Sequence, residues 1–226
     1  LREVRKFLVT HRQMGGNTVL GSGGTGGSTN ITKSDGLERS YHYAKNYSNT
    51  VVAQQHIVAD DVRLLVVGGV FRSAVIRKPA FVVGDGASSI ELLIATANTD
   101  LSRNDDSQSS LMHISPHAAR RYLGEKILTT PPADKKVRVV GPANVSLGGS
   151  LHEATHLVSK EMIKNAEGIS NKLDLGICGV DMIWDRTTDK HYLIEVNATP
   201  GIDIHDDPFS GTSSDVVPAY VQWLIA

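Results

Sequence analysis

The chain has 226 residues, of which 40% are hydrophobic and 21% are charged, with 21 glycines. This composition is typical of one or two globular domains with a real core, and it excludes disorder as the main state. Twenty-three Lys and Arg against 24 Asp and Glu give a net charge of −1, so we expect neither a nucleic-acid partner nor a membrane partner.

Cys178 is the single cysteine, so no internal disulfide can form, and a reducing cytoplasm is the expected location. No apolar stretch approaches the roughly 20 residues of a membrane-spanning helix. The first ten residues are too charged for a signal peptide. Because the chain starts at Leu1 and not at Met, we expect an excerpt or a processed product.

In the first part of the chain, residues 1–30 read as irregular and end in GSGGTGGSTN, where five glycines fall within seven positions. A helix is predicted over 33–47 from apolar residues at helical spacing. Three strands are predicted at 50–58, 62–70 and 71–83, with Gly68-Gly69 as the hairpin turn between the last two. A helix capped by Ser88 or Ser89 follows.

In the second part, the polar segment 101–110 is predicted to be a mobile loop. A short helix near 116–125, a strand at 135–140 and a second glycine-bearing loop at 141–150 come next. The remaining elements are a helix over 152–168 that ends at Gly168, a hairpin over 175–197 and a terminal helix over 213–226. Because strands and helices do not alternate strictly, we expect α+β packing.

The predicted hairpin separates polar from apolar side chains. If its turn is centred near Thr188, antiparallel pairing places Asp181 beside Glu195. One face then carries Asp181, Ile183, Leu193, Glu195 and Asn197, and the other carries Val180, Met182, Trp184, Tyr192, Ile194 and Val196. Two carboxylates this close should not both stay ionised without a cation.

Two carboxylates and an amide oxygen are suitable ligands for Mg²⁺, which often takes its other ligands from water and a nucleotide phosphate. A face that is simply solvated explains the same pattern equally well, since a shift of one residue would undo the pairing. The geometry alone leaves both interpretations open.

Five segments occur in a set order along the chain: VVAQQHIVADDVRLLVVGG, AVIRKPAFVVGDG, ANVSLGGS, CGVDMIWD and LIEVNATPGI. Together they resemble the ATP-grasp superfamily of carboxylate–amine ligases, and within it the branch of cyanophycin synthetase, bifunctional glutathione synthetase and N-acetylglutaminylglutamine synthetase. PAFVVGDG, followed by a helix and an Asn-containing loop with two glycines, selects this branch. The resemblance covers residues 50–226 well and residues 1–49 poorly.

The resemblance implies an ATP-grasp fold in which two α+β subdomains clasp the nucleotide. Residues 1–57 would form the lid subdomain with the glycine-rich loop, and residues 58–226 the C-terminal subdomain with the metal and substrate site. The implied enzyme is a ligase in which ATP phosphorylates a carboxylate and an amine then displaces the phosphate, giving an amide, ADP and phosphate. Its cofactors would be ATP and Mg²⁺ or Mn²⁺, its substrates amino acids or short peptides, and its assembly a homo-oligomer or part of a larger synthetase.

The resemblance also assigns roles to residues. Asp181, Glu195 and Asn197 fall at the family's magnesium positions, and Arg63 and Arg77 at catalytic positions facing the phosphates or the acyl phosphate. The implied ATP-binding residues are Gly23, Gly24, Gly26, Gly27 and Ser28 in the lid, Gln54, Gln55, His56 and Ile57 in the hinge, and Asp61 at the ribose. The implied substrate-binding residues are Asn144, Ser146, Gly148, Gly149 and His205.

Two departures from the family pattern concern the grip on phosphate. The lysine that relatives carry on the strand entering the lid is absent from NTVLGSGG (17–24), and Gly141-Pro142 stands where relatives often place an arginine. They support a second hypothesis, a nucleotide-binding regulatory relic of the fold. A third hypothesis is that the chain is one segment of a larger multidomain synthetase.

Overall fold

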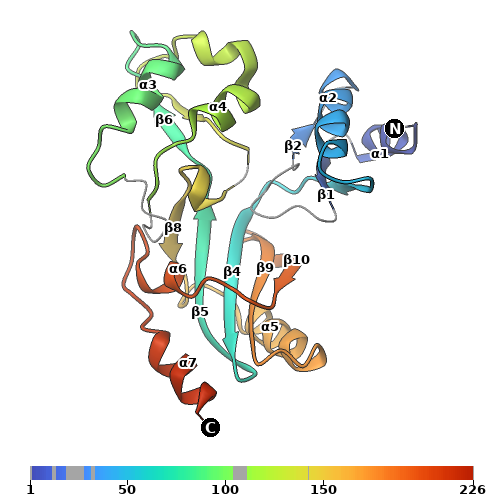
Figure 1. The fold of residues 1–226 in the computed structure, drawn as a ribbon, viewed down its shortest axis with the longest axis vertical. Coiled ribbons are helices and arrows are strands. Elements are labelled where there is room, and N and C mark those ends of the chain that lie inside the picture. The colour runs from blue at the N-terminus through green and yellow to red at the C-terminus, as the bar shows by residue number, and fades with distance from the viewer. Residues whose placement is uncertain are drawn as a thin grey trace.

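The structure is a computed structural model that describes residues 2–11, 14–18, 28–31, 34–103, 111–141 and 143–225. Its elements form three regions, which we call the lid region (2–55), the central region (60–78 and 150–225) and the insert region (81–147) (Figure 1). The mixture of helices with antiparallel sheets confirms the predicted α+β class. Among the described residues, no helix is long and apolar enough to cross a membrane.

The lid region pairs three short strands and packs two helices against them. Its elements are α1 (Arg2–His11), β1 (Met14–Thr18), β2 (Ser28–Ile31), α2 (Ser34–Lys45) and β3 (Val51–Gln55), with strand order β2-β1-β3. The prediction that the first thirty residues are irregular is wrong for Arg2–His11, Met14–Thr18 and the start of β2, and residues 19–27 lie outside the described residues. Burial of Leu8 from α1 against Ile31 and Leu37 holds that helix in place, and β1 is held by neighbours on both sides.

The central region is built on one five-stranded antiparallel sheet. Its elements are β4 (Asp60–Val67), β5 (Val70–Lys78), β8 (Ser150–Glu153), α5 (Lys160–Lys172), β9 (Ile177–Asp185), β10 (Lys190–Asn197), α6 (Asp203–Asp206) and α7 (Val217–Leu224). The strand order is β10-β9-β4-β5-β8, so β10 is an edge strand. The predicted turn at Gly68 and Gly69 is confirmed, with φ of 61° and 74°, which glycine adopts without steric cost.

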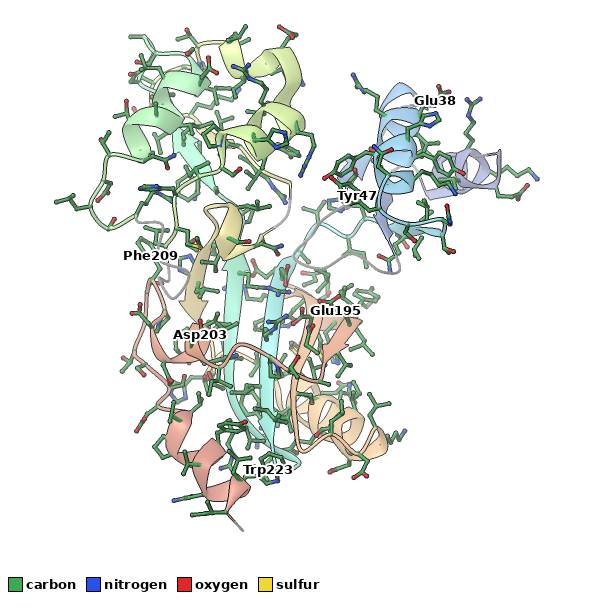
Figure 2. All side chains as sticks on the ribbon, viewed as in Figure 1. Glu38, Tyr47, Glu195, Asp203, Phe209 and Trp223 are labelled. Carbon is green, nitrogen blue, oxygen red and sulfur yellow. The ribbon has the colours of Figure 1, made fainter. Side chains whose placement is uncertain are left out.

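The two faces of this sheet differ in what covers them. Side chains of β4, β5 and β9 on one face pack with α5 in the largest apolar cluster, which includes Leu64, Met162 and Met182. On the other face, which we call the site face, Leu65 and Val67 pack with Val216 just before α7. The part of the site face towards the lid region carries a group of charged side chains beside apolar ones such as Val75 and Ile183. Glu195 marks this end of the sheet in Figure 2.

The predicted helix over 152–168 is wrong in its bounds. Residues Ser150–Glu153 form β8, which pairs with β5, and the helix α5 begins only after Ser159 caps it. The helix then runs through Gly168, where a Cβ would meet no atom within 4 Å, and ends at Lys172. Residues 152 and 153 pair with β5 as part of β8 and therefore do not join the helix. Local periodicity in the sequence does not reveal this pairing.

The insert region is a small layer of helices over a two-stranded sheet. Its elements are β6 (Phe81–Val83), α3 (Ile90–Ala97), α4 (Pro116–Leu123), the 3-10 helices η1 (Gly124–Leu128) and η2 (Val145–Leu147), and β7 (Lys136–Arg138). Ser89 caps α3 as predicted, and Ser115 caps α4. Residues 104–110 of the predicted mobile loop lie outside the described residues.

Candidate active site

The predicted pairing of Asp181 with Glu195 is present in the β9–β10 hairpin. Glu195 lies opposite Asp181, and Asn197 lies opposite Gly179. The Nδ2 atom of Asn197 is 3.4 Å from Oδ2 of Asp181 and 3.3 Å from Oε1 of Glu195. This part of the geometric prediction is confirmed, and the three polar side chains lie together on the site face.

The predictions that Leu193 shares the face of Asp181 and that Tyr192 lies on the opposite face are wrong. The cause is a bulge in β10 between Leu193 and Glu195. Before the bulge, Leu193 lies opposite Met182 and Tyr192 opposite Ile183. Leu193 therefore shares the α5 face, and Tyr192 shares the face of Asp181. One extra residue in one strand reverses the alternation on the far side of the bulge.

A ladder of four charged side chains crosses β9, β4 and β5 on the site face. Arg63 lies opposite Asp181, and Asp61 lies opposite Arg77. Nε and Nη2 of Arg63 donate to Oδ1 and Oδ2 of Asp181 at 2.6 and 2.7 Å. Arg77 donates to Oδ1 of Asp61 from Nε at 2.9 Å and from Nη2 at 2.5 Å, and its Nη2 also lies 3.0 Å from Oδ2 of Asp181.

The ladder stabilises the ionised form of Asp181. Only 1% of this residue is exposed, and burial by itself would raise the pKa of its carboxyl group. Hydrogen bonds from Arg63 and the charges of Arg77 and Arg63 outweigh that effect and hold the pKa below its usual range. Asp181 is therefore a buried anion that depends on its two arginines.

The side chains of Asp181, Glu195 and Asn197 carry oxygen atoms that suit a hard divalent cation. In the present structure these oxygen atoms are not all directed at a common position. Glu195 is exposed, so its carboxylate can turn towards a ligand. Asn197 presents its amide nitrogen to both carboxylates, and its amide must turn over to offer oxygen. The described part of the chain contains no group of three or more His, Cys, Asp or Glu side chains that could hold a metal.

His205 is fully buried and hydrogen-bonds to the buried hydroxyl group of Ser73, which also contacts the partly exposed hydroxyl groups of Ser214 and Thr155. Its Nδ1 is 3.0 Å from Oγ of Ser73, which donates to Ser214 at 2.8 Å and accepts from Thr155 at 3.3 Å. With the Ser73 proton directed at Ser214, Nδ1 of His205 is the donor. Burial, together with the charge of Arg63, lowers the pKa of His205 to about 3, so the ring is neutral.

The side chain of Arg63 lies close to the backbone of Gly179, and sequence reasoning missed this glycine. A Cβ on Gly179 would lie 3.1 Å from Cβ of Pro200 and 3.2 Å from Cδ and Nε of Arg63. The arginine stem therefore crosses β9 at a place that only glycine leaves open. The adjacency of Gly179 to Val180-Asp181 in the sequence was the available signal, but its partner lies on another strand.

The predicted ATP-binding residues are found where the lid region joins the central sheet. Gln54 and Gln55 end β3, and His56 and Ile57 follow them before β4 begins. Burial and the charge of Arg138 lower the pKa of His56. Ser28 is the first residue of β2, whereas Gly23, Gly24, Gly26 and Gly27 lie outside the described residues.

The predicted substrate loop is folded back against β5 and the insert region. Asn144 precedes η2, and its carbonyl accepts from the Gly149 amide at 3.1 Å. A Cβ on Gly148 would lie 2.5 Å from Cα of Ile114, and one on Gly149 would lie 2.8 Å from the carbonyl oxygen of Lys78. Both glycines therefore have a packing role, while substrate binding by Asn144 and Ser146 remains a prediction.

Comparison with solved structures supports the same architecture. A bifunctional glutathione synthetase from Pasteurella multocida matches 98% of this chain and 32% of its own, at 22% identity and a TM-score of 0.60. The ATP-grasp ligase PsnB, complexed with a phosphomimetic variant of its minimal precursor, Mg and ADP, matches 99% of this chain and 50% of its own, at 11% identity and a TM-score of 0.51. The chain has the ATP-grasp fold.

Curated relatives of the chain belong to the branch that its motifs resemble, so the predicted resemblance is confirmed. Cyanophycin synthetase from Trichormus variabilis is 29% identical over 216 residues, and the glutathione biosynthesis bifunctional protein GshAB from Listeria innocua is 29% identical over 200 residues. These matches cover 90% and 83% of this chain, but only 24% and 25% of the relatives, so it spans about a quarter of their length. No family model matches the chain.

Within this ATP-grasp fold, the charged ladder lies at the end of the central sheet that faces the lid region. Figure 2 shows Glu195 close below the lid, with Trp223 of α7 at the opposite end of the sheet. Trp223 lies against the backbone there, because a Cβ on Gly176 would come within 1.9 Å of its indole ring. The apolar end of the site face is therefore closed, and the charged end is the part available to a ligand.

Proposed function

We propose that the chain is the ATP-grasp part of a ligase that joins a carboxylate to the amine of an amino acid or short peptide, using ATP. The observation that carries this proposal is the convergence of Asp181, Glu195 and Asn197 with Arg63 and Arg77 at the lid-facing end of one sheet. A set of carboxylates beside guanidinium groups is suited to hold a metal-bound phosphate chain and to stabilise charge on it. The names of the relatives, synthetases of cyanophycin and glutathione, support the same reaction class.

In this reaction a carboxylate oxygen attacks the γ-phosphorus, and the bond to the β,γ-bridging oxygen breaks, so that ADP leaves. The amine nitrogen then attacks the acyl carbon, phosphate leaves with the carbon–oxygen bond pair, and the amine loses a proton. Bound Mg²⁺ or Mn²⁺ would neutralise charge on the phosphate oxygens, and Asp181, Glu195 and Asn197 would hold it. Arg63 and Arg77 would orient the phosphoryl group, and Asp61 the ribose.

The remaining assignments follow the same proposal. Residues 1–57 would act as the lid subdomain, with Gly23, Gly24, Gly26, Gly27 and Ser28 over the phosphates, and residues 58–226 as the subdomain with the metal and substrate site. Gln54, Gln55, His56 and Ile57 would contact the adenine. Asn144, Ser146, Gly148, Gly149 and His205 would lie around the acceptor. A homo-oligomer or a place within a larger synthetase stays a prediction.

A nucleotide-binding relic is the second candidate, and the absence of the lid lysine from residues 17–24 favours it. The two candidates differ in turnover. The decisive measurement is ADP release over a panel of amino acids and dipeptides, with Glu195→Gln as the variant. We expect substrate-dependent ADP release that falls by about 100-fold in Glu195→Gln, because a neutral amide replaces the anionic carboxylate that would hold the cation.

Calorimetry with a nonhydrolysable ATP analogue separates the outcomes. Binding of the analogue without ADP release from any substrate would favour the relic, and turnover would eliminate it. Turnover unaffected by Glu195→Gln would reject the metal role of that residue while leaving the ligase itself in place. Because Glu195 is exposed, the substitution should leave the fold intact.

A further inference from the structure

The oxygen of Asp181 that faces Glu195 and Asn197 is already fully engaged. Oδ2 is 2.7 Å from Nη2 of Arg63, 3.0 Å from Nη2 of Arg77 and 3.4 Å from Nδ2 of Asn197. A carboxylate oxygen offers about two lone pairs. A cation that joins Asp181 to Glu195 and Asn197 must therefore replace nitrogen donors on this oxygen.

The two arginines differ in how firmly they hold Asp181. Arg63 is its direct cross-strand partner, donates to both oxygens, and has its side chain close to the backbone of Gly179. Arg77 reaches Asp181 diagonally through one nitrogen. If that contact breaks, Arg77 keeps Asp61 as a partner through Nε and Nη2. Arg77 is therefore the donor that can give up its contact with Asp181 with the smaller loss of hydrogen bonds.

We propose that Arg77 and a divalent cation compete for Oδ2 of Asp181, so that Arg77 keeps the cation out of the site until a nucleotide phosphate draws the guanidinium away. The proposal rests on the metal role assigned to Asp181, Glu195 and Asn197 under the proposed function. It makes Arg77 a positioning residue that sets the order of binding: the cation enters with the nucleotide and not before it.

Charge supports the same order. Counted with every group ionised, Asp61, Asp181 and Glu195 together with Arg63 and Arg77 have a formal net charge of −1, from three carboxylates and two guanidinium groups. Removing Arg77 leaves −2 and removes a cation from the side of Asp181 that the metal would occupy. A phosphate is a better partner for a guanidinium than a shared carboxylate oxygen, because it can accept two parallel hydrogen bonds.

The test is a titration of the full chain with Mn²⁺ alone, without nucleotide, followed by electron paramagnetic resonance of the free ion. Arg77→Met removes the charge and keeps a stem of similar length, and Arg77→Gln is a second neutral variant that can still bond to Asp61. The control is Arg186→Met, in the turn after β9, which also removes one positive charge from an ion pair, here with Asp60 of β4. We expect both Arg77 variants to bind Mn²⁺ about tenfold more tightly than the native chain, and the control to change by less than about twofold.

Equal or weaker Mn²⁺ binding by the Arg77 variants, or an equal gain in Arg186→Met, would overturn the proposal. Adding Glu195→Gln to Arg77→Met must remove the gain, which places the bound ion at this site; a gain that persists also overturns it. The experiment needs no turnover, so a chain that releases no ADP can still pass it. Conversely, substrate-dependent ADP release without tighter Mn²⁺ binding in the Arg77 variants would reject the competition between Arg77 and the cation. It would leave the proposed ligase function unaffected.

Discussion

Arg63 and Asp181 face each other across β4 and β9 in a bidentate pair, with nitrogen–oxygen distances of 2.6 and 2.7 Å. Side-chain exposure is 14% for the arginine and 2% for the aspartate, so water screens the pair only weakly. Each charge is therefore stabilised mainly by the other and by Arg77. This relationship decides how the site responds to substitution.

Removing both partners of this pair should cost less stability than the sum of the two single removals, because each single removal leaves a buried charge without its direct partner. Arg63→Met leaves the Asp181 carboxylate buried with Arg77 as its remaining guanidinium, and we expect a loss of about 3 kcal/mol in the free energy of unfolding. Asp181→Asn should cost a similar amount, and the double variant clearly less than the sum. Urea unfolding of all four chains measures the coupling. Additivity to within about 0.5 kcal/mol would show that the two side chains do not depend on each other.

Gly179→Ala should disturb the site through the stem of Arg63. The added Cβ would lie 3.1–3.2 Å from Pro200 and Arg63, so one of them must shift. We expect the free energy of unfolding to fall by about 1–2 kcal/mol. Gly168→Ala is the matched control, since its Cβ meets nothing within 4 Å in the middle of α5. The control should gain about 0.5–1 kcal/mol from the lower chain entropy of the unfolded state. Equal effects of the two alanines in urea unfolding would contradict the close approach seen at Gly179.

His205 should make stability depend on pH on the acid side of neutrality. Its pKa is about 3 in the folded chain, against about 6.5 in an unfolded one, so below pH 6.5 the unfolded state binds a proton that the folded state does not. As the pH is lowered from about 6.5 to 3, this group therefore reduces the free energy of unfolding by up to ~1.4 kcal/mol for each pH unit. Above about pH 6.5 it makes no contribution to the pH dependence of stability.

The measurement is urea unfolding at several pH values for the native chain and for His205→Gln, which should lose this slope. His117→Gln, at an exposed position on α4, is the control and should keep it. An unchanged slope in His205→Gln would mean that another group causes the acid sensitivity.

The lid region contacts the insert region through Tyr43 and Arg121. Nη1 of Arg121 donates to the Tyr43 hydroxyl at 2.7 Å, and its guanidinium lies 4.6 Å from the centre of the tyrosine ring. Tyr43→Phe keeps the ring and removes the hydrogen bond, so local opening of α2 should become easier by about 1 kcal/mol, or roughly fivefold in amide exchange rate. Hydrogen exchange of residues 34–45 checks this.

Arg120→Met is the control for that experiment, because the Arg120 guanidinium pairs with Glu91 inside the insert region. It should leave exchange in α2 unchanged. If Tyr43→Phe also leaves exchange unchanged, the contact does not hold the lid.

Prediction from the sequence succeeded where a pattern was local. The predicted pairing of Glu195 with Asp181 is present, although the pairs next to the turn are offset by one residue from the predicted register and the bulge restores it. Gly68-Gly69 and Ser89 identified a turn and a helix cap. Prediction failed where the secondary structure or the side-chain direction of a residue depended on contacts with residues far away in the chain. The helix α1 depends on apolar contacts within the lid, and the bulge near Ile194 leaves no mark in the alternation of polar and apolar residues.

The sequence by itself determined that Glu195 and Asn197 share one face of their strand, because side-chain direction in a strand repeats every two residues. The register that brings this face to Asp181 includes a bulge, which only the folded hairpin shows. Only the tertiary structure decided that Arg63, 118 positions away in the chain, and Arg77 both bind Asp181. That depends on β4 lying between β9 and β5, and strand order is a global property of packing. The carboxylate predicted to await a metal ion is, in the folded chain, already held by two arginines.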